Sequence, residues 1–355
     1  MHDDLGMLPI SSALEAAQDP TFVLRNAAAA AVMAPSSHNT QPWRFRIVDS
    51  TLELLADPAR QLHVIDPERR QLVVSCGCAL FNARVAVRAM GFADEVTIML
   101  AERERPELLA TLHLGARIIT SDADLELVRA IALRHTNRRP FLARPVALAD
   151  SDRLAAAAER EGAWMVRLMP DQKHVLGDLI DDADRMQYAD PAFRAELARW
   201  LVSSASRRRD GIPFREKEYG SVLPFAVTRA LRSPELGRQF GRTEEQLVDA
   251  SPIVAVLGTS RDEPSEWLAC GQALQAVLLH ATSLGLAAAF VNQSLELPEL
   301  RRRIATITEH VGMPHMMLRL GYPAAPIAHA APRRDLDDVL EVAPSRDAID
   351  WLATH

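Results

Sequence analysis

Apolar residues follow two patterns along this chain, long helical segments and short continuous runs. Alanine- and leucine-rich stretches at 75–92 and 269–286 each end near a glycine, which predicts two long helices closed by a left-handed residue. Short apolar runs at 95–100, 253–258 and 287–293 are typical of strands. The chain is therefore predicted to mix helices and strands along its whole length.

The two long helices are similar to each other in sequence, which suggests an internal repeat. At a constant offset of 194 residues (270 − 76), five positions agree: Cys76 and Cys270, Gly77 and Gly271, Ala79 and Ala273, Leu80 and Leu274, Gly91 and Gly285. Two alanine- and leucine-rich helices can align by chance. However, a strand follows each helix, and a later strand with a glycine near its end follows at 111–116 and at 318–323. The same order of elements is thus predicted twice, and the small faces of the two helices would permit close packing.

The remaining elements are predicted from local signals. Asp19-Pro20 opens an alanine-rich helix at 21–33, and Asp49-Ser50 turns a hairpin between strands at 43–48 and 52–56. A helix with an Asp or Ser cap is predicted at 150–161, followed by a strand at 163–169. Another helix is predicted after Arg334.

Residues from about 195 to 246 have no counterpart in the first half of the chain. An insertion of this length in a compact domain is usually a lid, an arm or a disordered segment. Of these we favour a lid.

Length and charge narrow the class of protein. The chain has 355 residues, which predicts two domains, and its formal net charge is −7. Its short arginine clusters are interleaved with acids, which argues against nucleic-acid or membrane partners and favours small-molecule chemistry. The first ten residues lack the pattern of a secretory leader, and no run of about 18 apolar residues is found. A cytoplasmic location is predicted.

The cysteines and histidines do not form a recognisable metal or disulfide pattern. Cys76, Cys78 and Cys270 are too few for a disulfide framework, and the C-x-C pair lacks a second pair of zinc ligands. We expect them to be buried packing residues. Glu309-His310 and His315 lack the spacing of a zinc-protease helix, so no metal is predicted.

A polar loop at 34–45, APSSHNTQPWRF, is the most distinctive local string. It lies between a predicted helix and a predicted strand. The side chains of Ser36, Ser37, Asn39 and Gln41 could bind the donors and acceptors of a heterocycle. An ordinary helix cap and turn is the alternative from residue types alone.

Residues 35–43 resemble the flavin-contacting loop of the nitroreductase family, which carries P-S-S-x-N-x-Q-P-W before its first strand. In that family one subunit of a homodimer contributes this loop to a flavin held mainly by the other subunit. The resemblance implies that an FMN is contacted by Pro35, Ser36, Ser37, Asn39 and Gln41.

A second string, RHTNRRPF at 134–141, is similar to the family's Arg-x-Ser-x-Arg/Lys string, with Thr in place of Ser. The resemblance implies that Arg134 and Thr136 bind the FMN phosphate, which forked guanidinium groups suit, and that Arg138 lies near N1 and O2 of the ring. A solvated basic surface is the alternative for such a string alone.

Two weaker signals complete the candidate site. Arg333 and Arg334 occupy the place where related chains bring a basic residue to the phosphate, and the sequence does not tell which one points inward. Asn292 follows a strand at the place where family members offer backbone groups to flavin N5, although the usual glycine is missing.

The two halves carry complementary parts of the family's site. The first half has the ring-contacting loop without the arginine string, and the second half has the string without the loop. The resemblance therefore implies an α+β fold of two fused nitroreductase-type repeats, at 1–125 and 126–355, whose mostly antiparallel sheets are flanked by helices. A pseudo-dimer of this kind would hold one FMN between its halves and exist as a monomer, as in the two-domain Acg-like branch of the family.

The resemblance implies hydride transfer from NAD(P)H through FMN to a planar acceptor such as a nitroaromatic or a quinone. Such chemistry requires no catalytic side chain, because the flavin carries it. The alternative is an FMN-binding or flavin-storage protein with little turnover because a lid covers the flavin. A Rossmann enzyme is disfavoured, because no strand–GxGxxG–helix unit is present.

Overall fold

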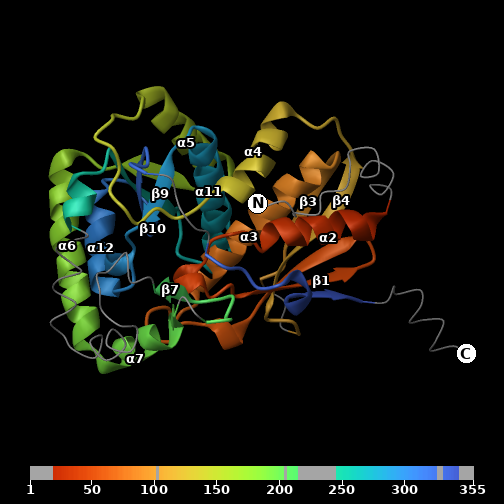
Figure 1. The fold of residues 1–355 in the computed structure, drawn as a ribbon, viewed down its shortest axis with the longest axis horizontal. Helices are drawn as coiled ribbons and strands as arrows, with labels where there is room; N and C mark the ends of the chain where they lie inside the picture. The colour runs from red at the N-terminus through yellow and green to blue at the C-terminus, as the bar shows by residue number, and fades with distance from the viewer. Residues whose placement is uncertain (1–18, 101–103, 204–205, 215–244, 326–330, 344–355) are drawn as a thin grey trace, which may run out of the picture.

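The computed structural model describes residues 19–100, 104–203, 206–214, 245–325 and 331–343. Two mainly antiparallel sheets lie on opposite sides of a central pair of helices, α3 (Arg70–Ala89) and α11 (Pro264–Ser283) (Figure 1). The predicted α+β architecture, with sheets flanked by helices, is confirmed.

The first sheet is built mostly from the first half of the chain. After α2 (Pro20–Ala31), it contains β1 (Trp43–Val48), β2 (Thr51–Ala56), β3 (Phe92–Ile98) and β4 (Leu108–Arg117). The predicted hairpin is present: Val48 pairs with Thr51, and Asp49 adopts the left-handed conformation that a tight turn requires (φ 53°). The order of these four strands in the sheet is β1-β2-β4-β3.

The second sheet repeats this arrangement. After α4 (Asp122–Leu133) and α5 (Leu148–Arg160), it contains β5 (Trp164–Arg167), β8 (Ile253–Thr259), β9 (Ala287–Phe290) and β10 (Met313–Gly321), with α12 (Pro298–Ile307) between the last two. The strand order is β5-β8-β10-β9, which corresponds strand by strand to that of the first sheet. The predicted cap of α5 is wrong: the helix begins two residues earlier, after Ala147, which makes no side-chain capping bond.

The central helices cross at the positions that the sequence repeat aligns. A Cβ atom on Gly77 would lie 2.3 Å from the carbonyl oxygen of Leu268, and one on Gly271 would lie 2.1 Å from that of Val74. Because 268 and 74 differ by the same 194 residues, the two contacts are equivalent under exchange of the halves, as two-fold packing requires. Only glycine allows this approach. The three cysteines are buried in or beside this contact, as expected.

Helix α3 has the length and apolar composition of a membrane span, and no other helix in the described ranges does. Most of α3 is buried by α2, α11 and the first sheet, as in a core helix.

The sequence between β5 and β8 has no counterpart in the first half and is longer than expected. Residues 168–252 replace the two-residue turn between β1 and β2, and contain α6 (Pro170–Ala189), α7 (Pro191–Trp200), β6 (Leu201–Ser203) and β7 (Ile212–Phe214). Leu197 and Trp200 of α7 pack against Leu62 and Ile65 of the first half. Much of the predicted lid, including residues 204–205 and 215–244, lies outside the described residues.

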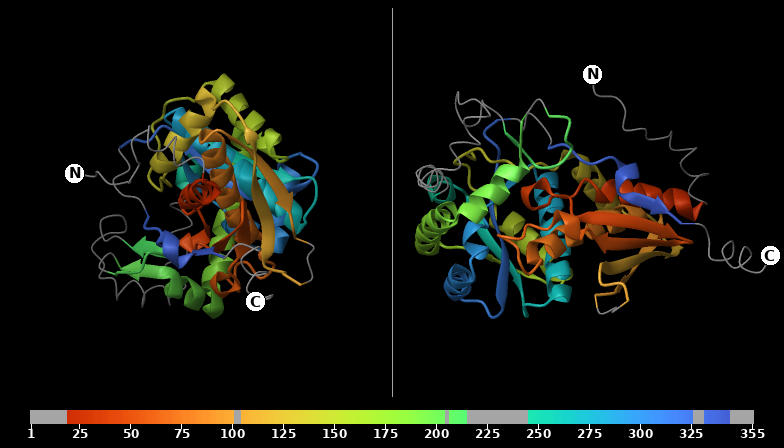
Figure 2. Two further views of the ribbon diagram at one scale, coloured as in Figure 1. Left: turned by 90° about the vertical axis from the view of Figure 1, so that its right-hand side faces the viewer. Right: turned by 90° about the horizontal axis from the view of Figure 1, so that it is seen from below.

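The C-terminal part of the described chain returns to the first sheet. The described residues after Arg334 do not form the predicted helix: a single 3-10 turn, η4 (Leu336–Asp338), precedes strand β11 (Leu340–Val342), which pairs in parallel with β1 (Figure 2). Asp335, Asp337 and Asp338 favour a turn because their short side chains compete for backbone groups, and the free edge of β1 then pairs with the residues that follow. Strand β11, from the end of the described chain, thus becomes part of the first sheet.

Candidate functional site

The polar loop at 34–42 connects α2 to β1 and has an unusual backbone. His38, Asn39 and Gln41 all have positive φ angles of 50–53°. For residues other than glycine this conformation costs about 1–3 kcal/mol each, and it persists where neighbours hold it, often at functional sites. Within the loop, the hydroxyl of Ser36 accepts a bond from the backbone N–H of Gln41 at 2.9 Å. Pro35 is buried beside it.

The side chain of Asn39 holds two distant segments against the loop. Its Nδ2 donates to the carbonyl oxygens of Gly211 and Pro332, each at 3.1 Å, and its Oδ1 accepts from Arg333 at 3.2 Å. Gly211 belongs to the insertion and Pro332 to the C-terminal segment. Asn39 therefore organises the site, and its polar atoms are already used by the protein.

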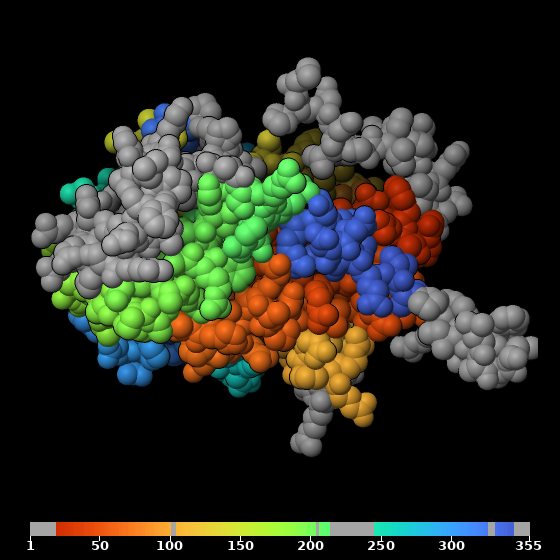
Figure 3. Space-filling view, turned by 60° about the horizontal axis from the view of Figure 1, so that its bottom comes forward, coloured from red at the N-terminus to blue at the C-terminus, as the bar shows by residue number. Residues whose placement is uncertain are grey.

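Gln41 is fully buried and, like Asn39, holds the insertion and the C-terminal segment against the loop. Its Nε2 donates to the carbonyl oxygen of Arg209 at 2.7 Å, and its Oε1 accepts from the backbone N–H of Arg334 at 2.7 Å. Figure 3 shows the resulting surface, where residues of the insertion (green) and of the C-terminal segment (blue) lie side by side against the first half (orange).

The arginine string of the second half begins where α4 ends. Thr136 forms an isolated parallel bridge with Ala288 of β9, and the backbone N–H of Asn137 donates to the carbonyl oxygen of Ala288 at 2.8 Å. These contacts attach the string to the edge of the second sheet. Arg134 is buried there, with 7% of its surface exposed, whereas Arg138 is exposed.

Arg134 and Arg333 are enclosed cations without a carboxylate partner among the residues that the structure describes. Burial lowers the pKa of Arg134 to about 10. Burial, with a further contribution from the charge of Arg134, lowers the pKa of Arg333 to about 9. The Nε atom of each is buried and has no hydrogen-bond partner in this part of the chain. A buried cation is costly unless an anion compensates it, so this pair favours an anionic ligand.

His38, which sequence reasoning did not select, lies at the same place. Burial, and then the charge of Arg138, lowers its pKa to about 4, so the imidazole is neutral at neutral pH. Its Nδ1 is buried and unpartnered within the described ranges. Because the charge of Arg138 acts on His38, the loop of the first half lies near the arginine string of the second. His38 occupies the variable position of the loop motif, which carries no signal by itself.

The side chains of two predicted residues, Arg334 and Asn292, make contacts outside the group formed by Arg134, Arg333 and His38. Arg334 reaches the carbonyl oxygen of Asp338 at 3.1 Å and lies 3.9 Å from the carboxylate of Asp57, so Arg333 is the inward member of the pair. The Oδ1 of Asn292 accepts from the backbone N–H of Met317 at 2.8 Å. The Asn292 side chain therefore serves the second sheet, and the expected contact between its backbone and flavin N5 stays a prediction.

Ser37 joins a hydrogen-bonded cluster that the sequence did not predict. Its hydroxyl donates to the Oε1 of Gln71, whose Nε2 donates to Glu296 at 3.0 Å. Gln187 of the insertion also donates to Glu296, at 2.6 Å. Burial raises the pKa of Glu296 to about 7, despite the bonds from Gln71 and Gln187. The cluster unites the loop, α3, the second half and α6.

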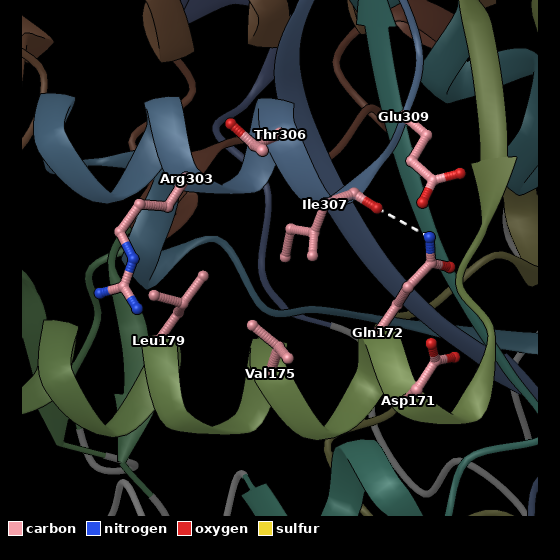
Figure 4. Close-up of a pocket in the computed structure, with 8 residues that line it drawn as sticks. All are labelled: Asp171, Gln172, Val175, Leu179, Arg303, Thr306, Ile307 and Glu309. Atoms are coloured by element: carbon pink, nitrogen blue, oxygen red, sulfur yellow. Dashed lines mark hydrogen bonds between the residues drawn. The ribbon is translucent and has the colours of Figure 1, made fainter.

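A shallow groove between α6 and α12 contains none of the predicted residues (Figure 4). Val175, Leu179 and Ile307 form its apolar part, with Arg303 at one end and Asp171 and Glu309 at the other. It lacks the enclosed cations described above, so the anion-binding features lie at the polar loop.

Comparisons with known proteins agree with the motifs. No family model matches the chain. A Mycobacterium tuberculosis protein named "Putative NAD(P)H nitroreductase" is 32% identical over 318 residues, which are 88% of this chain and 89% of that one. A second protein from this organism, with the same name followed by acg, is 29% identical over 335 residues, 91% of this chain and 96% of that one.

Among solved structures, a nitroreductase with bound FMN from Bacteroides fragilis is 15% identical and covers 59% of this chain and 94% of its own, with a TM-score of 0.37. Because this TM-score is low, the assignment of the chain to a family rests on the sequence relatives alone.

Proposed function

Because the chain belongs to the nitroreductase family, we propose that it is an FMN-dependent oxidoreductase that transfers hydride from NAD(P)H to a planar acceptor such as a nitroaromatic or a quinone. The observation that carries the proposal is the pair of enclosed, uncompensated cations Arg134 and Arg333 beside the polar loop. A phosphate with nearly two negative charges matches that pair.

The residues present fit FMN in two parts. Arg134 and Arg333 would hold the phosphate, because each has a buried Nε–H without a partner in the described ranges. Pro35, Ser36 and Ser37 of the loop would contact the ring. Bound FMN supplies the hydride chemistry, while the protein fixes its position and surrounding charge. Arg138 would add positive charge near N1 and O2 of the ring. Neutral His38 adds no competing charge.

One FMN per chain is proposed, because the loop and the arginine string each occur once. Residues 32–42 connect α2 to β1, whereas only residues 161–163 connect the equivalent α5 to β5. Three residues are too few to form the same loop. A monomer, with its two repeats acting as a pseudo-dimer, would therefore be sufficient, and the cytoplasmic location stays a prediction.

A second candidate is an FMN-binding protein with little turnover. The observation that favours it is the attachment of the insertion to the loop: the backbone N–H of Gly211 donates to the carbonyl oxygen of Asn39 at 3.2 Å, and Asn39 and Gln41 bind Gly211 and Arg209 in return. Arg60 reinforces it by donating to Asp210 at 2.9 Å. A segment fixed in this way would restrict the approach of a second planar molecule.

Two measurements test these proposals. Titration of the purified apoprotein with FMN, followed by flavin fluorescence, should give one site per chain, and a stoichiometry of two or none would contradict the single site. The loaded protein is then mixed anaerobically with NADPH or NADH. Loss of flavin absorbance supports the oxidoreductase, whereas bound FMN that neither nucleotide bleaches supports the storage protein.

A further inference from the structure

Glu296 ends a chain of hydrogen bonds that begins at the loop. The hydroxyl of Ser37 donates to Gln71, and Gln71 donates to one oxygen of Glu296 at 3.0 Å. The other oxygen of Glu296 accepts from Gln187 at 2.6 Å. Both oxygens of the carboxylate are therefore acceptors.

An ionised carboxylate can only accept hydrogen bonds, and this fixes the direction of the whole chain. Gln71 must turn its NH₂ group to Glu296 and its carbonyl oxygen to Ser37. The hydroxyl proton of Ser37 is then committed to Gln71, and only lone pairs remain on Ser37 Oγ for a ligand. Ser75 lies beside this chain of bonds: its hydroxyl donates to the backbone carbonyl oxygen of Gln71 at 2.7 Å and accepts from the backbone N–H of Ser37 at 3.4 Å.

The charged groups that face Glu296 are Arg70 and Asp66. Arg70 donates to the carbonyl oxygen of Leu295 at 2.5 Å and favours the carboxylate, whereas the negative charge of Asp66 disfavours it. Asp66 itself accepts from the backbone N–H groups of Gln71 and Leu72, at 3.0 and 2.9 Å, which fixes the start of α3. The balance allows Glu296 to change protonation state near neutral pH.

We propose that Glu296 is a positioning residue that makes Ser37 a hydrogen-bond acceptor toward an N–H group on the edge of the bound flavin. The proposal rests on FMN binding as proposed above. A protonated Glu296 carries its own donor, so Gln71 can reverse and Ser37 can present its proton to the ligand. FMN should therefore bind more tightly above the pKa of Glu296 than below it.

The test compares FMN dissociation constants at pH 6 and pH 8.5 for the full chain and for Glu296→Gln. The variant has one acceptor oxygen where the carboxylate has two, so it cannot accept from both Gln71 and Gln187 and no longer fixes the direction of Gln71. Its affinity at pH 8.5 should therefore be about 3- to 10-fold weaker than that of the unmodified chain. Its remaining pH dependence should be only that of the phosphate and of the groups that both proteins share. Glu299→Gln, an exposed change three residues away, should behave as the unmodified chain.

Ser37→Ala removes the other end of the chain and supplies a second test should Glu296→Gln fail to fold. This variant should lose the same part of the pH dependence, and in the double variant the two losses should not add, because both act through one path. Equal affinity and pH dependence in Glu296→Gln and the unmodified chain, or additive losses, would overturn the inference. An unmodified chain that binds no FMN at all would instead refute the proposed function.

Discussion

Two groups of arginines in this molecule differ in one respect, the presence of carboxylates. Arg84 and Arg88 lie on α3 and contact Asp94 at 2.7 and 2.8 Å. Arg84 also pairs with Glu161, and Arg88 with Asp124 at 2.8 Å. Arg134 and Arg333 have no such partner in the described ranges. All four are wholly or partly withdrawn from solvent.

The pKa of Arg84 and the pKa values of the two unpaired arginines shift in opposite directions. Burial tends to lower the pKa of Arg84, but Glu161 and Asp94 outweigh it and raise the pKa above its usual value. For Arg134 and Arg333 nothing outweighs burial, and the pKa falls. The paired group therefore joins parts of the fold, whereas the unpaired group is suited to an anion that comes from outside the chain.

Breaking the paired group should have the largest effect on stability. Arg84→Met leaves Glu161 without this cation and Asp94 with Arg88 alone, and we expect it to lower the free energy of unfolding by about 3 kcal/mol. Urea unfolding of the apoprotein measures this. Arg153→Met, which removes a long, mostly exposed ion pair on α5, is the control and should change stability by less than about 0.5 kcal/mol. A small loss for Arg84→Met would show that the carboxylates find other partners.

Arg134→Met should lower affinity for FMN without lowering stability, in contrast to Arg84→Met. It removes an uncompensated charge, so the apoprotein should be as stable as before or more stable. Affinity for FMN should fall about 30- to 100-fold, which corresponds to the loss of a charge-assisted contact to phosphate. FMN titration and urea unfolding of the same variant measure the two effects. Arg129→Met, an exposed change on α4, which ends just before Arg134, should alter neither. Unchanged FMN affinity in Arg134→Met would remove the phosphate assignment.

The sequence could predict those parts of the site that lie within one short string. Residues 35–43 and Arg134 can be selected as candidate site residues because neighbours in sequence stay neighbours in the fold. The offset of the repeat likewise indicates Gly77 and Gly271 as equivalent positions of the two central helices. Glu296 could not be found in this way. It contacts Gln71 and Gln187 only after α3 and α6 pack beside the residues that follow β9, and no local sequence pattern indicates that packing.

The turn and the strand at 336–342, where a helix is expected, could not be predicted from the sequence for a related reason. Residues 336–342 have a local pattern compatible with a helix, but β1 offers a free edge, and only tertiary structure shows that Leu340 pairs with Phe45. Which of Arg333 and Arg334 points inward also depends on this pairing of the C-terminal segment with the first sheet, because the pairing places Arg334 near Asp57.

Arg333→Met sharpens the comparison within the unpaired group. The remaining Arg134 can still bind phosphate, so we expect a smaller loss of FMN affinity, about tenfold. Arg334→Met is the matched control, because its side chain points away, and its affinity should change less than about twofold. Equal losses in the two variants would contradict the assignment of Arg333 as the inward residue.

The smallest effect is expected for a change of His38, which lies near the unpaired arginines and is neutral at neutral pH. Its folded pKa of about 4 lies below its ordinary value of 6.5. The unfolded chain therefore binds a proton between these values while the folded chain does not, so stability falls as pH decreases through this window. His38→Asn should remove about 1 kcal/mol of the loss in unfolding free energy between pH 6.5 and 5.5. The exposed His63→Asn should leave the loss unchanged. If the stability of His38→Asn falls with pH as much as that of the unmodified chain, His38 becomes charged in the folded protein. The surroundings of Arg134 and Arg333 would then accept a further cation without an anion.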